Sequence, residues 1–398
     1  MIILKKDKFL AVSFLVIIFS IFLAIPFNFI FNKLGLITIN YDNFISFEKR
    51  EEKSFADKIN NKVFSIENSI ENKFTNYFPF YNDLNELYHG VNFYGNSLIY
   101  KNVPIRTNSD GEYIFYDKEN QFYYLKGKYS NEELDKRLLK QINFFNKLSD
   151  DVSLYIYLPT RYEFTNILND NLSQYVEKFV NGLNSNINVS VMNIDDINQY
   201  KNYFYKTDHH WNISGALSGY YDILDMFQLN DANKYEIKIN ENRKFYGSMA
   251  KTALSDVVYD YISDINYYPE YKVLVNDKLP EDIFKPRNIR LDRDYKYYDY
   301  YVSYYNGQYG KVVYDYSDES KENLLIIGDS YTWQIDYLIA QHFNKTHVIN
   351  LRYDEFKNNN FDMTSYMKKN NIQKVLFLYD GGSTLFDQYN YNFEGRIK

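Results

Sequence analysis

Cysteine is absent from this 398-residue sequence, which excludes disulfide bonds and thiolate metal sites. The sequence shows no cluster of Lys and Arg that would form a phosphate-binding face and the formal net charge is -7, so nucleic acid is not an expected partner. The chain has no internal repeat and no glycine-rich loop that could cradle a phosphate. It is long enough for a membrane anchor with one large domain or two small ones, and for a sizeable hydrophobic core.

The longest uncharged run, from Phe9 to Asn32, lies close to the N-terminus. As a helix, about 24 residues would span about 36 Å, which is enough to cross a hydrocarbon core of about 30 Å. Lys5, Lys6 and Lys8 precede the run, so the positive-inside rule keeps the N-terminus in the cytoplasm. We therefore predict a single-pass anchor at residues 1–35 in the cell membrane, with the rest of the chain extracellular. A cleavable signal peptide is the alternative, but no Ala-x-Ala-like site closes the run.

Residues 36–95 are expected to form a helical segment next to the membrane. Apolar residues recur there in steps of three and four, at Phe55, Ile59, Val63, Ile66 and Ile70. This spacing is typical of one or two amphipathic helices. A solvated stalk without regular structure is the alternative.

The remainder, residues 96–398, alternates between apolar strands and helices. Its first half predicts short strands at Ser97–Tyr100 and Gly111–Tyr116, helices at Asn131–Leu148 and Leu172–Leu183, and strands at Val152–Leu158 and Val189–Ile194. A helix capped by Ser214 follows, with an inward stripe of Ala216, Leu217, Tyr220, Ile223, Leu224 and Phe227. A β-rich, Tyr-rich insertion is expected at about 251–320. The C-terminal part predicts strands at Leu324–Ile327, Val348–Leu351 and Val375–Leu378, with helices from Thr332 and near Thr364–Asn370.

This alternation predicts an α/β fold with a mostly parallel sheet covered on both faces. Ligands of such sheets bind at the carboxyl ends of the strands. The residues expected at these ends are Pro159-Thr160-Arg161, Ser330, Arg352 and Asp380.

Two short motifs carry the groups that a serine-type acyl-transfer site needs. Thr207-Asp208-His209-His210-Trp211-Asn212 supplies a carboxylate and imidazoles, and Gly328-Asp329-Ser330 supplies a hydroxyl. In an extended segment, residues i and i+2 point the same way, so Asp208 can reach the ring of His210 while His209 points elsewhere. Ser330 follows an apolar run and precedes a helical pattern, which places its hydroxyl at a strand-to-helix turn. We therefore predict Ser330 as nucleophile, His210 as base and Asp208 as the acid that orients it.

Two other interpretations of these motifs stay open. Asp, His and Trp can fill space beneath a loop or cap a turn, and Asp and Ser are ordinary residues at a helix start. A metal site is the other, because Asp208, His209 and His210 are all potential ligands. Adjacent histidines do not easily point at one ion, however, and no His-Glu-x-x-His pattern completes a ligand set. We therefore expect neither a metal nor a cofactor. His89, His342 and His347 have no carboxylate neighbour at a useful spacing.

Tyrosine is very frequent, with 44 residues. Aromatic faces stack on sugar rings, but Asn, Ile and Lys are abundant too, which indicates a general compositional bias. No individual tyrosine is assigned to a site from composition.

The motifs resemble those of the bacterial DHHW family, which is similar to the SGNH-like proteins of alginate O-acetylation. The resemblance rests on Thr207–Asn212 and Gly328-Asp329-Ser330, and further on Phe47-Glu48-Lys49-Arg50-Glu51, Asp110-Gly111-Glu112-Tyr113-Ile114-Phe115 and Phe245-Tyr246-Gly247-Ser248, which occur in the family's order. It implies a flavodoxin-like α/β/α fold and an extracytoplasmic acyl-transfer role on a polysaccharide. It also implies the same roles for Ser330, His210 and Asp208, and a membrane-bound O-acyltransferase as partner.

One departure concerns the oxyanion site. SGNH hydrolases carry an Asn after a late strand, whereas here Val375–Leu378 leads into Tyr379-Asp380-Gly381-Gly382. Backbone N–H groups of Ser330, Gly381 and Gly382, or of the Arg352 loop, are the candidates instead. Arg161, Trp211 and Arg352 are candidate substrate contacts.

The sequence thus predicts a membrane-anchored serine acyltransferase or acetylesterase acting on O-acetyl groups of a cell-surface or exported polysaccharide. Whether a sugar hydroxyl or water accepts the acyl group stays open. A catalytically inactive glycan-binding or scaffold protein of a polysaccharide assembly is the alternative, and a cell-surface protease is a weaker one.

Overall fold

The computed structural model describes residues 81–107, 113–126, 130–167, 172–229, 233–265, 267, 272–278, 296–305, 307–353, 356, 361–387 and 393–397. The predicted anchor at 1–35 and most of the segment at 36–95 lie outside these residues. Within the described part of the chain, no helix is both long enough and apolar enough to cross a membrane. The chain divides into two compact units, Met1–Asn92 and Phe93–Lys398, and the second contains all of the described strands.

A mixed sheet of seven strands forms the centre of the second unit, in the order β5-β4-β12-β10-β11-β9-β8. Its strands are β4 (Ser153–Leu158), β5 (Asn188–Val191), β8 (Lys272–Val275), β9 (Lys311–Asp315), β10 (Asn323–Gly328), β11 (Lys345–Ile349) and β12 (Ile372–Leu378). The five strands from β5 to β11 run parallel, whereas β9 and β8 add antiparallel pairs at one edge. The predicted α/β fold with a mostly parallel sheet is confirmed.

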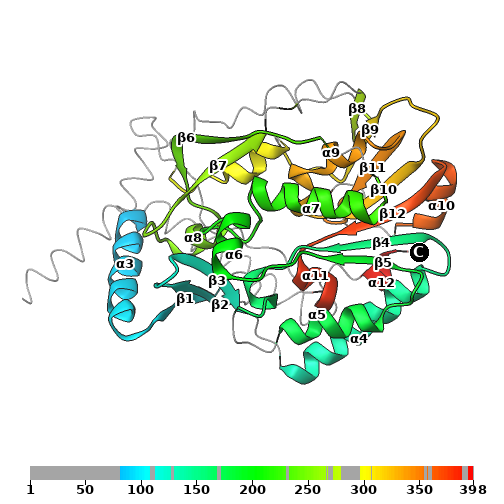
Figure 1. Ribbon diagram of the computed structural model, residues 1–398. Coiled ribbons are helices and arrows are strands. Elements are labelled where there is room, and N and C mark those ends of the chain that lie inside the picture. Colours follow the sequence, from blue (N-terminus) through cyan, green and yellow to red (C-terminus); the bar gives the residue numbers. More distant parts are fainter. Residues whose placement is uncertain are drawn as a thin grey trace, which may run out of the picture. The chain divides into compact units, whose positions relative to one another are not determined.

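Both faces of this sheet are buried, because its central strands alternate between two hydrophobic cores. In β10, Leu324 and Ile326 face one core while Leu325 and Ile327 face the other, and all four side chains are fully buried. The first core contains residues of α7 (Ile213–Met226) and α9 (Asp336–Ala340). The second contains residues of α4 (Asn131–Leu148), α5 (Ser173–Gly182), α10 (Met363–Lys369), α11 (Gly381–Phe386) and α12 (Phe393–Arg396). Figure 1 shows α7 on one side of the sheet and α4 and α5 on the other.

Smaller elements complete the unit. An antiparallel sheet contains β1 (Asn102–Thr107), β2 (Tyr113–Asp117) and β3 (Phe122–Lys126), and a second pairs β6 (Ile237–Phe245) with β7 (Asp260–Ile265). Short helical segments are η1 (Tyr162–Phe164), α6 (Ile197–Tyr203), α8 (Ser248–Ala253), η2 (Tyr300–Tyr304) and η3 (Ser330–Gln334). The predicted insertion at about 251–320 is therefore continuous with its surroundings: β7 pairs with a preceding strand, and β8 and β9 extend the central sheet.

Three local predictions were wrong. Ser97–Ile99 is the last turn of helix α3 (Tyr81–Ile99) instead of a strand, because a short apolar run fits both periods. Helix α7 is capped by Asn212, not Ser214: its side-chain oxygen accepts the backbone N–H groups of Ser214 and Gly215. The helix expected from Thr332 begins as the 3₁₀ segment η3, and α9 follows from Asp336. The predicted inward stripe of α7 is buried throughout.

Candidate active site

Ser330, Arg352, Asp380 and Arg161 each lie just beyond the carboxyl end of a parallel strand. These strands, β10, β11, β12 and β4, are neighbours in the sheet, so the four residues lie along one edge. The histidine motif reaches this edge from the loop between α6 and α7. The histidine motif and Gly328-Asp329-Ser330, which are far apart in the sequence, therefore meet at the carboxyl ends of the parallel strands.

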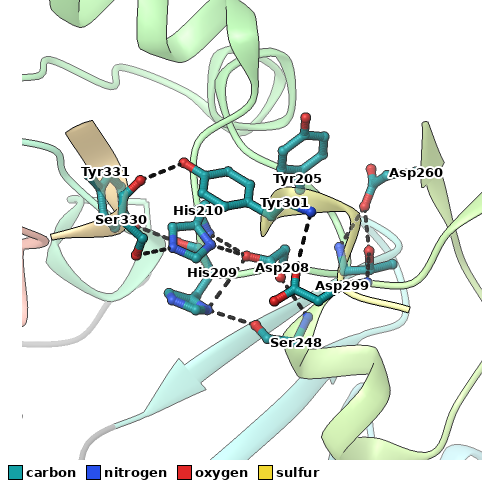
Figure 2. A network of polar contacts seen from close by, with 12 residues as sticks. Tyr205, Asp208, His209, His210, Ser248, Asp260, Asp299, Tyr301, Ser330 and Tyr331 are labelled. Atoms are coloured by element: carbon teal, nitrogen blue, oxygen red, sulfur yellow. Dashed lines mark hydrogen bonds and ion pairs between the residues drawn. The ribbon is translucent and has the colours of Figure 1, made fainter. Parts of the chain in front are cut away.

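A continuous hydrogen-bonded chain connects the three predicted catalytic residues. His210 Nδ1 lies 2.5 Å from Asp208 Oδ1, and His210 Nε2 lies 2.6 Å from Ser330 Oγ. All three residues are buried, with exposed fractions of 1% for Asp208, 6% for His210 and 8% for Ser330. Figure 2 shows the carboxylate, imidazole and hydroxyl in this sequence. The chain is the arrangement in which an imidazole can take the proton of a serine hydroxyl.

The motif loop is anchored at Thr207. Its backbone N–H and its hydroxyl both donate to Asp260 Oδ2, at 2.8 and 2.6 Å. Asp260 belongs to β7, so the antiparallel pair of β6 and β7 holds the loop in place. Asn212, at the other end of the motif, starts α7 and donates its backbone N–H to Tyr203. Both ends of the short loop are thereby fixed.

Asp208 is oriented by backbone groups as well as by His210. Its Oδ2 accepts the Ser248 N–H at 2.6 Å, and its Oδ1 accepts the His210 N–H at 3.0 Å. Gly247 makes this possible, because a Cβ there would lie 2.4 Å from the Asp208 Cβ. Gly247 and Ser248, the last two residues of the Phe245-Tyr246-Gly247-Ser248 motif, thus support the carboxylate.

The charges of the motif are interdependent. Burial raises the pKa of Asp208, but the two histidines and the hydrogen bonds outweigh burial and hold the pKa below its ordinary value. Burial and the neighbouring His210 lower the pKa of His209 well below its ordinary value. Asp208 is therefore an ionised acceptor and His209 a neutral imidazole at neutral pH.

His209 does not point away from the site as predicted. Its ring centroid lies 3.9 Å from that of His210, and its Nδ1 lies 2.7 Å from Ser248 Oγ. The hydroxyl of Ser248 holds the ring there, next to the carboxylate that the Ser248 N–H contacts. The i, i+2 argument selects the histidine that bonds Asp208, but it does not place the other one.

Tyr301 is a residue of the site that the sequence did not reveal. Its ring stacks on the His210 imidazole with a centroid distance of 3.9 Å and an interplanar angle of 11°. Its hydroxyl donates to the Ser330 carbonyl at 3.1 Å. Asp299 caps η2 by accepting the Tyr301 N–H, which fixes the start of this segment. An Asp two residues before a tyrosine is too common a signal to distinguish it among 44 tyrosines.

The backbone N–H of Ser330 is available to a ligand. Asp329 caps η3 and its carboxylate accepts the Tyr331 N–H, while the Ser330 N–H makes no hydrogen bond among the described residues. The N–H of Gly382, another predicted oxyanion donor, donates to Asp380 Oδ1 at 2.9 Å, so it is already bound in this structure. The Arg352 N–H is likewise bound, to Asn350 Oδ1. Gly381 begins α11, and within the described residues its N–H has no acceptor.

A group of buried charged residues includes Asp329, the residue before Ser330. The Arg161 guanidinium is 2.6 Å from Glu163 Oε1 and 3.6 Å from Asp380 Oδ1, and its side chain is only 2% exposed. Burial, together with the charge of Asp380, raises the pKa of Asp329 to about 6. Within this group, Arg161 pairs with two buried carboxylates, those of Glu163 and Asp380.

The other two predicted substrate contacts differ in position. Trp211 is fully buried in the core, in edge contact with Tyr331, so its ring presents no surface to a substrate. Arg352 is half-buried at the end of β11, with its guanidinium 5.6 Å from the Tyr353 ring centroid. Substrate binding by Arg161 and Arg352 stays a prediction.

Asp208, His209 and His210 have potential ligand atoms within 4.8 Å of one another. A cation at this position would have to displace the proton between Asp208 and His210. Two other potential ligand atoms are also hydrogen-bonded: Asp208 Oδ2 to the Ser248 N–H, and His209 Nδ1 to the Ser248 hydroxyl. The donor set thus fits a hydrogen-bonded triad better than a metal centre.

The remaining histidines of the central unit make structural contacts. His342 Nε2 lies 2.8 Å from the Tyr220 hydroxyl, and His347 Nδ1 lies 2.8 Å from that of Tyr366.

Of the motifs behind the family resemblance, Phe47–Glu51 and Asp110–Glu112 lie outside the described residues, and Tyr113-Ile114-Phe115 lies in β2.

Comparisons with known proteins identify relatives of this fold. No protein-family model matches the sequence, and no curated protein does. Among solved structures, Bacillus cereus PatB1 with a sulfonyl adduct matches with a TM-score of 0.55 and 19% identity, over 71% of this chain and 99% of the other. A DHHW family protein from Eubacterium siraeum DSM 15702 matches with a TM-score of 0.51 and 14% identity, over 72% and 96%. The O-acetyltransferase domain of Pseudomonas putida AlgJ has a TM-score of 0.38 and 11% identity, over 71% and 92%. The chain therefore shares its fold with PatB1 and with a DHHW family protein, which confirms at the level of the fold the resemblance that the motifs indicate.

Proposed function

We propose that this protein is a serine acyltransferase or acetylesterase that acts on O-acetyl groups of a cell-surface or exported polysaccharide. The observation that carries the proposal is the hydrogen-bonded chain from Asp208 through His210 to Ser330. Its fold is shared with a DHHW family protein and with PatB1, which was solved with a sulfonyl adduct. The membrane anchor and a membrane-bound O-acyltransferase partner belong to the same proposal.

The reaction would proceed in two steps. His210 takes the proton of Ser330 as Oγ attacks an acyl carbonyl, and Asp208 stabilises the imidazolium that forms. The Ser330 N–H donates to the oxyanion, with the Gly381 N–H as the candidate second donor. His210 then protonates the leaving alcohol, which leaves an acyl ester on Ser330. A sugar hydroxyl or water attacks this ester and releases the serine.

Labelling with a sulfonyl fluoride tests the proposal directly. The full-length protein in detergent should be modified at Ser330, and Ser330→Ala should abolish labelling and the turnover of p-nitrophenyl acetate. Ser383→Ala, which removes a buried serine hydroxyl bonded to Asp380, is the matched control and should still be labelled. A folded wild-type protein without labelling and without esterase turnover would instead favour the inactive glycan-binding protein.

A further inference from the structure

His209 is more exposed than its two neighbours in the hydrogen-bonded chain, Asp208 and His210. Its side chain is 26% exposed, compared with 8% for His210 and 2% for Asp208. Its ring lies against His210 on the side opposite Tyr301, as Figure 2 shows. A molecule bound beside His210 on this side can therefore contact His209.

The orientation of His209 is fixed from two sides. Its Nδ1 lies 2.7 Å from Ser248 Oγ and 3.6 Å from Asp208 Oδ1, so this edge of the ring faces inward. Its carbonyl accepts the hydroxyl of Tyr331 at 2.5 Å, which ties its backbone to the residue after the nucleophile. The other ring nitrogen, Nε2, makes no hydrogen bond among the described residues. The position of His209 Nε2 is thus fixed, although no described residue forms a hydrogen bond with it.

The electrostatics decide which nitrogen of His209 carries the proton. Its lowered pKa makes the ring neutral at neutral pH, so only one of the two nitrogens is protonated. The Asp208 carboxylate near Nδ1 favours the proton on that side, where it can be donated to Ser248 Oγ. Nε2 then carries a lone pair toward the approach side and can accept a hydrogen bond.

We propose that His209 Nε2 forms the acyl-acceptor subsite and binds a second hydroxyl, adjacent to the attacking one, of a carbohydrate acceptor. This inference rests on the proposed function, because it concerns the step in which acyl-Ser330 is attacked. Sugars carry such neighbouring hydroxyls, whereas water and simple alcohols do not. His209 would therefore select a sugar over water and set the ratio of transfer to hydrolysis.

The proton balance of this step needs nothing beyond the triad. The acceptor oxygen bonds to the acyl carbon, and its proton moves to His210 Nε2. The bond from the acyl carbon to Ser330 Oγ then breaks, and the same proton returns to that oxygen. His209 neither gains nor loses a proton, and it contributes one hydrogen bond to the hydroxyl that does not react.

A role through the triad alone is the competing explanation, since Ser248 contacts both His209 and Asp208. The two explanations differ in the step that they affect. A residue that only supports Asp208 would slow acylation and deacylation together. A residue that binds the acceptor would leave acylation intact and change only the partition of the acyl group.

The experiment measures both steps in the full-length protein with p-nitrophenyl acetate. The burst of p-nitrophenol reports acylation, and the products formed with water, ethanol or methyl glucoside report the partition. His209→Asn keeps a polar group that can reach Ser248 but has no atom at the Nε2 position, whereas the longer side chain of His209→Gln can present its amide oxygen there. We expect a burst within about threefold of wild type for both variants. The ratio of glucoside transfer to hydrolysis should fall about tenfold in His209→Asn and recover in His209→Gln, the size expected for one hydrogen bond. Transfer to ethanol should be unchanged.

Three results would overturn the inference. A glucoside-to-water ratio equal to wild type in His209→Asn would show that the ring does not touch the acceptor. A burst lost in proportion to transfer would assign His209 to the support of Asp208. A wild-type acyl-enzyme that hydrolyses but never transfers to the glucoside would remove the subsite while leaving the proposed acyl-serine chemistry intact. Failure of the proposed function itself is recognised separately, by the absence of any wild-type burst.

Discussion

The ring of Tyr301 lies flat against the imidazole of His210, with the two centroids 3.9 Å apart. The same tyrosine donates its hydroxyl to the carbonyl of Ser330. It therefore contacts both His210 and Ser330 from a segment, η2, that belongs to neither motif. A hydrogen bond to Asp208 alone would leave the imidazole free to rotate about the Nδ1–Oδ1 axis. The stacked ring of Tyr301 restricts this rotation.

Replacement of Tyr301 separates these two contacts. Tyr301→Phe keeps the stacked ring and should lower kcat/KM on p-nitrophenyl acetate less than about tenfold, the size of one hydrogen bond. Tyr301→Leu removes the flat face and should lower it about 100-fold, because small misplacements of a catalytic group are costly. The pH profile of kcat/KM should shift in Tyr301→Leu and stay in place in Tyr301→Phe. Equal losses in both variants would contradict an orienting role for the ring.

Asp208→Asn tests the charge that faces His210. The amide is nearly the same size as the carboxylate but cannot stabilise an imidazolium, so kcat should fall by about 10³–10⁴-fold. The melting temperature should fall modestly, because the single amide oxygen can accept only one of the two backbone N–H groups, those of Ser248 and His210, that the two carboxylate oxygens accept. A rate within about tenfold of wild type would indicate that the carboxylate only fixes the loop.

Gly247→Ala tests the close approach that supports Asp208. The new Cβ would lie 2.4 Å from the Asp208 Cβ and 2.6 Å from its Oδ2, so the carboxylate must move. We expect a loss of about 100-fold in kcat/KM with a small decrease in melting temperature. Gly95→Ala is the control, since nothing lies within 4 Å of its Cβ position. It should be as active as wild type.

Stability should depend on pH through Asp329. Burial raises its pKa to about 6 from an ordinary value of 3.8, so the folded protein prefers the neutral carboxyl. This contribution to stability is complete below about pH 4 and is lost as the pH rises through about 6, with a size on the order of 2–3 kcal/mol. Asp329→Asn should therefore show a smaller decrease in melting temperature between pH 5 and pH 7.5 than wild type. The exposed Asp151→Asn is the control, and the prediction is wrong if both variants follow wild type.

Chelation tests the metal interpretation of the motif. Incubation with EDTA followed by desalting should leave acylation of Ser330 unchanged, because the proton between His210 and Asp208 occupies the place of an ion. Activity lost on chelation and restored by Zn²⁺ would instead assign Asp208, His209 and His210 to a metal site.

Sequence patterns predicted most of the central sheet and its helices. Leu324–Ile327 and Val375–Leu378 are uninterrupted apolar runs, and such runs are buried on both faces of a parallel sheet whatever surrounds them. The predicted helix Asn131–Leu148 matches α4 residue for residue, because Ser130 caps its first turn and its apolar residues recur at helical spacing. Predictions failed where two local conformations fit the same residues, as at Ser97–Ile99, or where two candidate caps lie close together, as at Asn212 and Ser214.

By itself, the sequence predicted which residues make up the core of the candidate site. The spacing of Asp208 and His210 selects the imidazole that can bond the carboxylate, and the apolar strand before Ser330 places the hydroxyl at the end of a parallel sheet. Tertiary structure alone decided which groups surround this chain of atoms. Tyr301, Gly247 and Ser248 reach it from other segments, and the buried charges of Arg161 and Asp380 pair across two strand ends. Such contacts depend on how distant segments pack together. No periodic pattern within the sequence of a single segment predicts them.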